Sequence, residues 1–214
     1  MELIASLVDI VLRLDVHLGV LVQNYGSWVY AILFAVIFAE TGLVVTPFLP
    51  GDSLLFVAGA LAALGGLDVH ILTIALILAA ILGNTTNYAV GRWLGRRFFT
   101  EGRSRWIRRE HLDRTHAFYE RHGGSAVVIS RFLPIIRTYV PFVAGLAEMS
   151  YARFTAYNVA GAVLWVASLA YAGYFFGNLP WVRTNLSLII VAIIVLSLVP
   201  IAVTAWKSRS GNGA

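Results

Sequence analysis

Long apolar stretches dominate the hydropathy pattern of this chain, and four of them are long enough to cross a lipid bilayer as helices. A helix needs roughly 20 apolar residues to span the hydrocarbon core, so each stretch predicts a transmembrane helix. The four stretches cover residues 27–45, 69–91, 153–176 and 184–206.

Two further apolar stretches, at residues 46–65 and 125–148, are interrupted by proline and charge and nearly repeat each other. Each contains Phe-Leu-Pro and then, after a short spacer, Phe-Val-Ala-Gly. Apolar segments that Pro and Gly interrupt in both halves of a membrane protein indicate a transport site. The breaks are expected at Pro47, Pro50 and Gly51 in the first stretch and at Pro134 and Pro141 in the second.

The charge pattern predicts how these segments are oriented. Between Arg92 and Arg121 nine arginines stand against four acids, a net of 9 − 4 = +5. Basic segments stay on the cytoplasmic side, which places residues 92–122 and the C-terminus inside. The two broken stretches must then be re-entrant hairpins, with 125–148 entering from the cytoplasm and 46–65 from outside, as an inverted repeat.

The predicted fold is therefore an all-α integral membrane protein with about four transmembrane helices and two opposed re-entrant hairpins. Near the N-terminus apolar residues recur at helical spacing among charged ones, so residues 1–25 are expected to form an amphipathic helix on the membrane surface. We interpret residues 1–214 as a single membrane domain. Its parts are residues 1–25, 26–91 with the first hairpin, 92–122 as a basic cytoplasmic segment, 123–178 with the second hairpin, and 179–214 as the last transmembrane helix and tail.

The composition supports this class. Of the 214 residues 59% are hydrophobic and only 13% are charged, against about 25% charged in a soluble domain. The chain has no cysteine, which excludes a disulfide scaffold and thiolate metal sites. No nucleic-acid-binding motif accompanies the basic segment, so nucleic acid is not an expected partner. His111, His116 and His122 lie in that segment without acidic or apolar surroundings, and no metal or other cofactor is predicted.

Four ionisable residues, Glu40, Asp52, Arg131 and Arg137, lie inside the apolar segments. Each costs roughly 2.5–3.5 kcal/mol at the centre of a bilayer, so they must pair with one another or face water. One interpretation is that they form ion pairs that lock the hairpins together. The other is a functional site, which we favour because the desolvation of a buried ion pair can exceed its Coulombic gain.

The four residue types suit the transport of a phosphate. Arg131 and Arg137 are predicted to bind it, because guanidinium groups form bidentate hydrogen bonds with phosphate. Glu40 and Asp52 are predicted to carry protons and to act as counter-charges, because a carboxylate at membrane depth is driven toward its neutral form. An anionic lipid headgroup is the kind of phosphate compound that needs a path through the bilayer.

Three asparagines lie within the predicted long helices, at Asn84, Asn87 and Asn158. Amide side chains between membrane helices form hydrogen bonds that hold the helices together. They also line polar cavities, and the sequence leaves both interpretations open. We group the three with the prolines and Gly51 as support for the cavity and the hairpins.

Other functions remain open at this stage. A proton-coupled antiporter of small ions or drugs uses the same acids, and a phospholipid scramblase uses the same hairpins. A membrane lipid phosphatase needs a nucleophile with a positioned base, but no histidine follows Ser130 at a usable spacing, so enzyme activity is not expected. The sequence also leaves open whether the protein forms a homo-oligomer.

Two groups of motifs in the chain resemble those of the DedA family, also called the VTT or SNARE-associated family. The signatures are Phe38-Ala39-Glu40-Thr41-Gly42 with Pro47-x₂-Pro50-Gly51-Asp52, and Ser130-Arg131-Phe132-x-Pro134-x₂-Arg137 with Pro141-x₃-Gly145-x₃-Met149. The connecting motifs are Tyr88-x₂-Gly91-x₃-Gly95 and Phe154-x₃-Asn158-x₂-Gly161-x₃-Trp165.

This resemblance implies a multi-pass protein of the bacterial inner membrane with two opposed re-entrant hairpins. It implies transport of undecaprenyl phosphate or another polyprenyl phosphate in some members, proton dependence in others, and phospholipid scrambling in eukaryotic relatives. The essential acids of the family fall on Glu40 and Asp52, and its essential arginines fall on Arg131 and Arg137.

Overall fold

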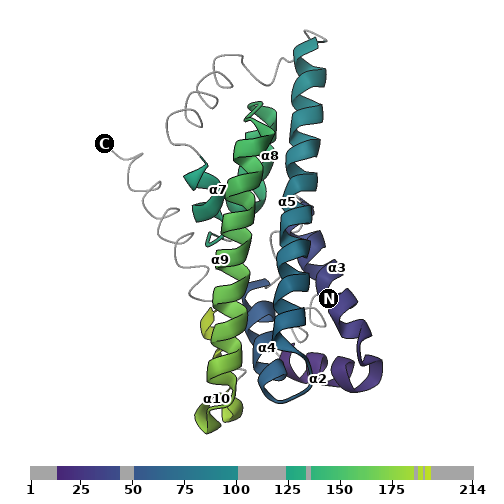
Figure 1. The fold of residues 1–214 in the computed structure, drawn as a ribbon, viewed down its shortest axis with the longest axis vertical. Coiled ribbons are helices and arrows are strands. Elements are labelled where there is room, and N and C mark those ends of the chain that lie inside the picture. The colour runs from purple at the N-terminus through teal and green to yellow at the C-terminus, as the bar shows by residue number, and fades with distance from the viewer. Residues whose placement is uncertain are drawn as a thin grey trace, which may run out of the picture. The chain divides into compact units, whose positions relative to one another are not determined.

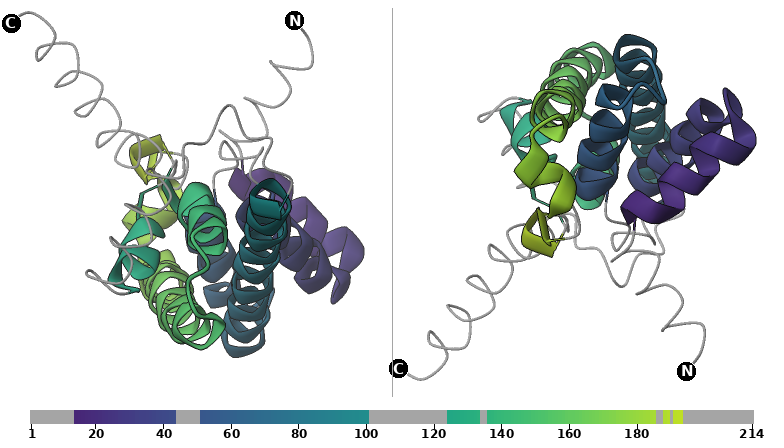
Figure 2. Two further views of the ribbon diagram at one scale, coloured as in Figure 1. Left: turned by 90° about the horizontal axis from the view of Figure 1, so that it is seen from above. Right: turned by 90° about the horizontal axis from the view of Figure 1, so that it is seen from below.

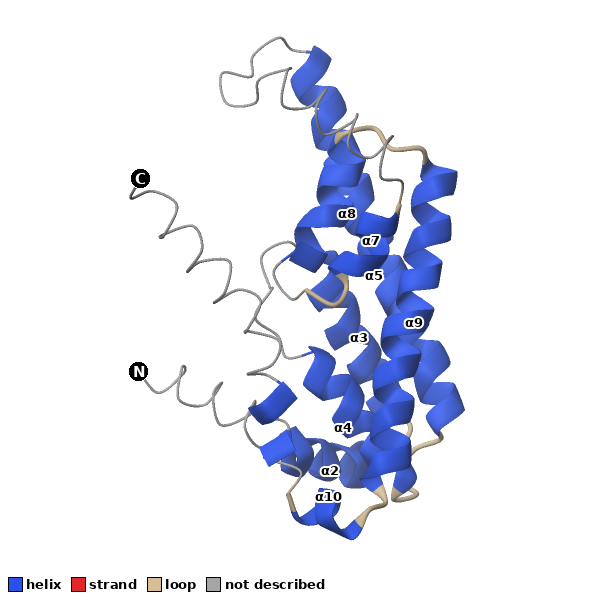
Figure 3. Ribbon diagram, turned by 90° about the vertical axis from the view of Figure 1, so that its left-hand side faces the viewer, coloured by secondary structure: helices blue, strands red, loops and turns tan. Residues whose placement is uncertain are grey.

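Every element in the described part of the chain is a helix. The computed structural model describes residues 14–43, 51–100, 124–133, 136–185, 188–189 and 191–193, and Figure 3 draws only helices and loops among them. The predicted all-α class is confirmed for these residues. The helices are α2 (Leu14–Tyr25), α3 (Trp28–Gly42), α4 (Gly51–Ala63), α5 (Val69–Thr100), α7 (Ser125–Ser130), α8 (Ile136–Leu146), α9 (Tyr151–Gly177) and α10 (Pro180–Thr184).

Among the described residues, α5 and α9 are the two helices that are long and apolar enough to cross a membrane. They have 32 and 27 residues, or about 48 and 40 Å at 1.5 Å per residue. Figure 1 shows both as continuous helices, α5 in teal and α9 in green. α9 confirms the predicted helix at 153–176. α5 runs past residue 91, where the predicted apolar stretch ends, and the basic cytoplasmic segment at 92–122 stays a prediction. Hydropathy marks where lipid contact ends, whereas arginine and leucine continue a helix readily.

α3 and α4 are apolar but shorter. α3 has 15 residues, about 22 Å, and ends at Gly42 rather than at the predicted residue 45. Glycine is common where helices end. α4 has 13 residues and begins at Gly51, where the first hairpin was predicted to break. Whether α3 crosses the bilayer, and whether α4 belongs to a re-entrant hairpin, stays a prediction.

The second broken stretch folds as two short helices, α7 and α8, which pack against each other. They have 6 and 11 residues, about 9 and 16 Å, so each is too short to cross a core of about 30 Å. The described part of the break between them is Arg131–Leu133. Pro141 was expected to be a second break, but it lies inside α8, and this prediction was wrong. A proline removes one helical hydrogen bond, and membrane helices tolerate this where neighbouring groups compensate.

Several predictions fall outside the described residues. These include Pro50 and Pro134, residues 1–13 of the N-terminal helix, residues 101–122 of the basic segment with its three histidines, and most of the predicted helix at 184–206. α2 lies within the predicted N-terminal helix and packs against α4.

The chain divides into two compact units, each assembled from separate stretches. Unit 1 comprises residues 1–33, 50–75 and 166–214. Unit 2 comprises residues 34–49 and 76–165. The division into parts that we expected from the sequence, with the repeats at 26–91 and 123–178, stays a prediction.

Within unit 1, α4 packs directly on the second half of α9 through glycines. A Cβ atom added to Gly59 would overlap the carbonyl oxygen of Ala170, and one added to Gly173 would overlap that of Phe56. Gly177 extends this contact to Ala60, whose Cα would lie 2.7 Å from an added Cβ. Small residues allow helix backbones to approach closely, which is how membrane helices associate without a hydrophobic driving force. Figure 2 shows α4 beside α9 in its end-on views.

Within unit 2, α8 packs on the second half of α5 in the same way. A Cβ on Gly145 would overlap the carbonyl oxygen of Tyr88, and one on Gly91 would overlap that of Phe142. Gly95 continues the contact toward Leu146. The glycines of Phe-Val-Ala-Gly, 59 and 145, thus have equivalent roles in the two copies. α4, from the first half of the sequence, thus packs on α9 from the second half. In the same way α8, from the second half, packs on α5 from the first half.

The aromatic core of unit 2 connects the middle of α5 with the start of α9. The ring of Tyr88 stacks on Phe154 with centroids 4.3 Å apart, and its hydroxyl donates a hydrogen bond to the carbonyl of Met149. Arg92 donates to the same hydroxyl at 3.0 Å. These contacts hold α5 in place directly beside Asn87.

Candidate functional site

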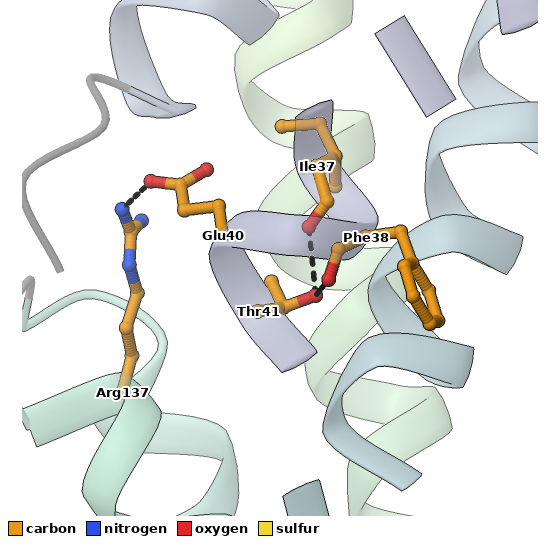
Figure 4. A network of polar contacts seen from close by, with 5 residues as sticks. All are labelled: Ile37, Phe38, Glu40, Thr41 and Arg137. Carbon is orange, nitrogen blue, oxygen red and sulfur yellow. Dashed lines mark hydrogen bonds and ion pairs between the residues drawn. The ribbon is translucent and has the colours of Figure 1, made fainter. Parts of the chain in front are cut away.

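Unit 2 contains a buried ion pair between α3 and α8. Glu40 lies two residues before the end of α3 and is fully buried, and Arg137 lies in the first turn of α8 and is 4% exposed. The guanidinium of Arg137 donates to the carboxylate of Glu40. Figure 4 shows the two side chains pointing toward one another, whereas the hydroxyl of Thr41 turns back onto its own helix. The predicted pairing of acid and arginine is therefore present for these two residues.

Arg131 is bound in a different way. It lies at the break after α7, it is 2% exposed, and one of its terminal nitrogens donates to three neutral oxygens. These are Oδ1 of Asn158 at 2.6 Å, the carbonyl of Asn158 at 3.3 Å and the carbonyl of Ala80 at 3.4 Å. No carboxylate among the described residues forms an ion pair with it. A buried guanidinium with only neutral partners is costly unless a further anion approaches it.

Trp165 brings the two arginines into one site. The guanidinium carbons of Arg131 and Arg137 lie 5.9 and 5.3 Å from the centroid of its ring. An indole face attracts cations at such distances. Trp165 is buried, and one turn earlier Gly161 leaves room for Arg131, whose Cδ would lie 3.0 Å from an added Cβ. The ring therefore helps to hold two like charges close together.

Two of the three predicted asparagines bind the segments that carry the charges. The amide of Asn87 donates to the carbonyl of Thr138 at 2.6 Å and weakly to that of Thr41 at 3.5 Å, the residues that follow Arg137 and Glu40. Asn158 binds Arg131 directly. Asn84 is also buried, on the same helix as Asn87.

Asp52 belongs to unit 1 and is half-buried in the first turn of α4. A carboxylate is favourable there, because the first turn of a helix exposes unpaired N–H groups and carries partial positive charge. Gly51, the residue that precedes Asp52, is buried. Of the four ionisable residues predicted for the site, unit 2 therefore brings together Glu40, Arg131 and Arg137.

Sequence reasoning missed the contact of Trp165 with both arginines. The spacing Asn158-x₂-Gly161-x₃-Trp165 places the three residues on one face of α9, which is a signal that they act together. The described residues contain no group of three or more His, Asp or Glu side chains that could hold a metal ion.

The sequence matches a known protein family and several known proteins. Residues 49–175 match the VTT domain. The chain is 57% identical over 202 residues to Protein DedA of Escherichia coli strain K12, which covers 94% of this chain and 92% of the relative. The chain belongs to the DedA family.

Other relatives share the membrane location of this DedA family member. An uncharacterized membrane protein of Mycobacterium leprae is 42% identical over 171 residues, or 80% of this chain and 77% of the relative. The inner membrane protein YqjA of Escherichia coli strain K12 is 35% identical over 190 residues, or 86% of each chain. No solved structure matches the chain. With its two candidate spans, the chain is a membrane protein.

Proposed function

We propose that this DedA family protein moves a phosphate-bearing lipid, of the polyprenyl phosphate class, across the inner membrane. The observation that carries the proposal is the buried guanidinium of Arg131, bound only by neutral oxygens and 5.9 Å from the centroid of an indole ring. A phosphate oxygen supplies the negatively charged partner that Arg131 lacks. Guanidinium groups bind phosphate in bidentate geometry. Arg137 faces the same ring and provides a second donor.

The ion pair of Glu40 and Arg137 supports coupling to protons. A phosphate that binds Arg137 competes with the carboxylate of Glu40 for the same donors. Glu40 is fully buried, and a buried carboxylate that loses its cation is stable only in its neutral form. Binding of the phosphate therefore favours uptake of a proton by Glu40, and loss of that proton favours release of the phosphate. Asp52 serves as a second proton carrier in this proposal.

The shortness of α7 and α8 supports a re-entrant second hairpin. Two short helices that pack against each other bring Arg131 and Arg137 to membrane depth without crossing. Irregular backbone is tolerated at that depth where it is buried in protein or lines a wet cavity. A lipid whose headgroup passes such a break keeps its hydrocarbon chain in the bilayer. Movement of this kind breaks no covalent bond and requires no cofactor.

Translocation by the purified protein in proteoliposomes tests the proposal. A fluorescent polyprenyl monophosphate is placed in one leaflet, and its appearance in the other is measured with and without a pH gradient. We expect Arg131→Ala and Arg137→Ala to reduce the rate at least tenfold, and Arg131→Lys to retain only part of it because ammonium lacks the planar fork. Arg153→Ala, at the exposed start of α9, is the matched control and should transport normally.

Unchanged translocation in folded arginine variants would reject the proposal. A rate that is independent of the pH gradient and equal for neutral phospholipids identifies a scramblase. Proton flux that is driven by a soluble drug or ion, without lipid movement, identifies an antiporter. Release of labelled phosphate from the lipid identifies an enzyme.

A further inference from the structure

The three oxygens that accept hydrogen bonds from Arg131 are all uncharged, and Asn158 supplies two of them. The bond to Oδ1 of Asn158 is the shortest, at 2.6 Å. Asn158 is fully buried on α9, one turn before Gly161 and two turns before Trp165, so one helix face contacts the guanidinium at several points. An asparagine thus occupies the position where an aspartate would form a buried ion pair.

The orientation of this amide is set from the other side. The Nδ2 of Asn158 donates to the carbonyl of Ile81 at 3.1 Å and to the hydroxyl of Thr85 at 3.3 Å. The hydroxyl of Thr85 in turn donates to the same carbonyl at 2.7 Å. Because carbonyl oxygens only accept, the NH₂ group must face α5 and the Oδ1 must face Arg131. The amide therefore cannot flip without losing bonds on both sides.

We infer that Asn158 is a specificity-determining residue: it holds Arg131 in place with a neutral acceptor, so that the charge of the guanidinium is left for an anionic phosphate ligand. The inference rests on the proposed function: Asn158 determines whether the charge of Arg131 is available to the phosphate. An aspartate at this position has nearly the same shape but neutralises the cation. A glutamine or alanine lacks the geometry that α5 imposes.

A purely structural role for Asn158 predicts the opposite result for one substitution. If the residue only tied α9 to α5 and to Arg131, Asn158→Asp would strengthen the bond to the guanidinium and leave ligand binding unaffected. If it preserves the charge for a ligand, the same variant folds normally but binds phosphate poorly.

The full-length protein in detergent, with farnesyl monophosphate as the probe, tests the inference. We expect Asn158→Asp to keep or raise the melting temperature while raising the Kd at least tenfold between pH 5 and pH 7.5. Asn178→Asp, in the exposed turn after α9, makes the same chemical change away from the site and should bind as the wild type does. Wild-type affinity in Asn158→Asp at all pH values overturns the inference.

Two further variants keep the test decisive if Asn158→Asp does not fold. Asn158→Ser keeps a neutral acceptor and should bind within about threefold of wild type, a difference of roughly 0.6 kcal/mol. Asn158→Leu removes the acceptor and should bind at least tenfold more weakly. Equal binding by the serine and leucine variants overturns the inference.

A measurement without ligand separates this inference from the proposed function. In a protein whose other five tryptophans are replaced by phenylalanine, Trp165 reports on the guanidinium beside it. The emission of Trp165 should shift in Asn158→Asp, because a carboxylate there neutralises the guanidinium beside the ring, and should stay unchanged in Asn178→Asp. If wild-type protein neither binds the probe nor moves lipid, the proposed function fails, and this comparison still decides whether Asn158 controls the charge at Arg131.

Discussion

The contact of α4 with α9 in unit 1 and the contact of α8 with α5 in unit 2 share one backbone plan but carry different chemistry. In each, two glycines press against carbonyl oxygens of the partner helix, at equivalent positions of the repeated Phe-Val-Ala-Gly sequence. The first turn of α4 carries Asp52, whereas the first turn of α8 carries Arg137. The two copies of the repeat therefore share their helix packing but carry opposite charges.

The residues that follow α4 and α8 also differ. After α4, Gly65 has φ +85° and its N–H bonds the carbonyl of Ala62 at 3.0 Å. After α8, Glu148 has φ 55° and its N–H bonds the carbonyl of Gly145 at 3.1 Å. Both are left-handed C-caps, a position that glycine occupies without strain and glutamate does not. The copy that carries the arginines thus contains the strained residue.

The largest effect on stability is expected from breaking the ion pair in unit 2. Glu40→Gln leaves the buried Arg137 without its carboxylate and should lower the free energy of unfolding by about 3–5 kcal/mol. Asp52→Asn, at a half-buried position of unit 1, should lower it less. Chemical denaturation in detergent measures both.

A double variant separates stability from transport at this pair. Glu40→Leu with Arg137→Met replaces the pair by apolar side chains and should recover most of the lost stability, because such replacements are often neutral. Transport should remain absent. Restored transport in the double variant would contradict the role of the pair.

The next effect concerns the glycine contacts and tests whether the two units are equivalent. Gly59→Ala in unit 1 and Gly145→Ala in unit 2 each place a methyl group against a backbone carbonyl, and each should cost about 1–3 kcal/mol. Thermal unfolding in detergent measures the loss. Gly19→Ala on α2 has open space around it and should be neutral or stabilising. A large loss in one unit only would show that the two contacts differ in strength.

A smaller effect is expected at the helix ends. Glu148→Gly relieves a left-handed residue and should raise the free energy of unfolding by about 1 kcal/mol, whereas Gly65→Ala should lower it by a similar amount. Differential scanning fluorimetry of the paired variants is sufficient. A loss of stability in Glu148→Gly would indicate that the glutamate side chain itself stabilises unit 2.

The smallest effect is a pH dependence at the start of α5. The backbone N–H of Ile71, followed by that of His70, donates to the carboxylate of Asp68, and these bonds lower the pKa of Asp68 below its ordinary value of 3.8. A lowered folded pKa stabilises the protein fully above the ordinary value, and this contribution disappears as the pH falls through the folded pKa. Asp68→Asn should therefore flatten the acid side of the stability profile, measured from pH 6 to pH 2, and a profile unchanged by the substitution would contradict the assignment.

Hydropathy predicted the parts of the fold that depend on local composition. The bounds of α9 lie within two residues of the predicted helix at both ends, because its apolar content ends where the helix ends. α5 did not follow this pattern, since its helix continues through Arg92 after its apolar stretch ends. Pro141 was misjudged because a proline signals a break only when nothing else satisfies the backbone around it.

The site was predictable in its charges but not in its pairing. Burial cost alone identified Glu40, Arg131 and Arg137, since charges at membrane depth need partners. Arg137 pairs with Glu40 because α8 approaches α3, and Arg131 binds Asn158 because the end of α7 approaches α9. No local sequence pattern encodes either approach. The packing role of Gly173 and Gly177 was predictable from the sequence, because their spacing repeats that of Gly91 and Gly95.

The exchange of partners between the halves has a consequence for how the protein is made. The glycine face of α4 is complete once Ala63 has been synthesised, but its partner Gly173 follows 173 − 63 = 110 residues later. At 5–20 residues per second the nascent α4 waits roughly 6–22 s for the helix that covers it. During this interval the first half cannot complete its own packing, and α8 meets a waiting α5 as soon as it emerges. A polypeptide that stops after α5 is left with two uncovered glycine surfaces, so the insertion machinery or a quality-control protease should recognise it as unfinished.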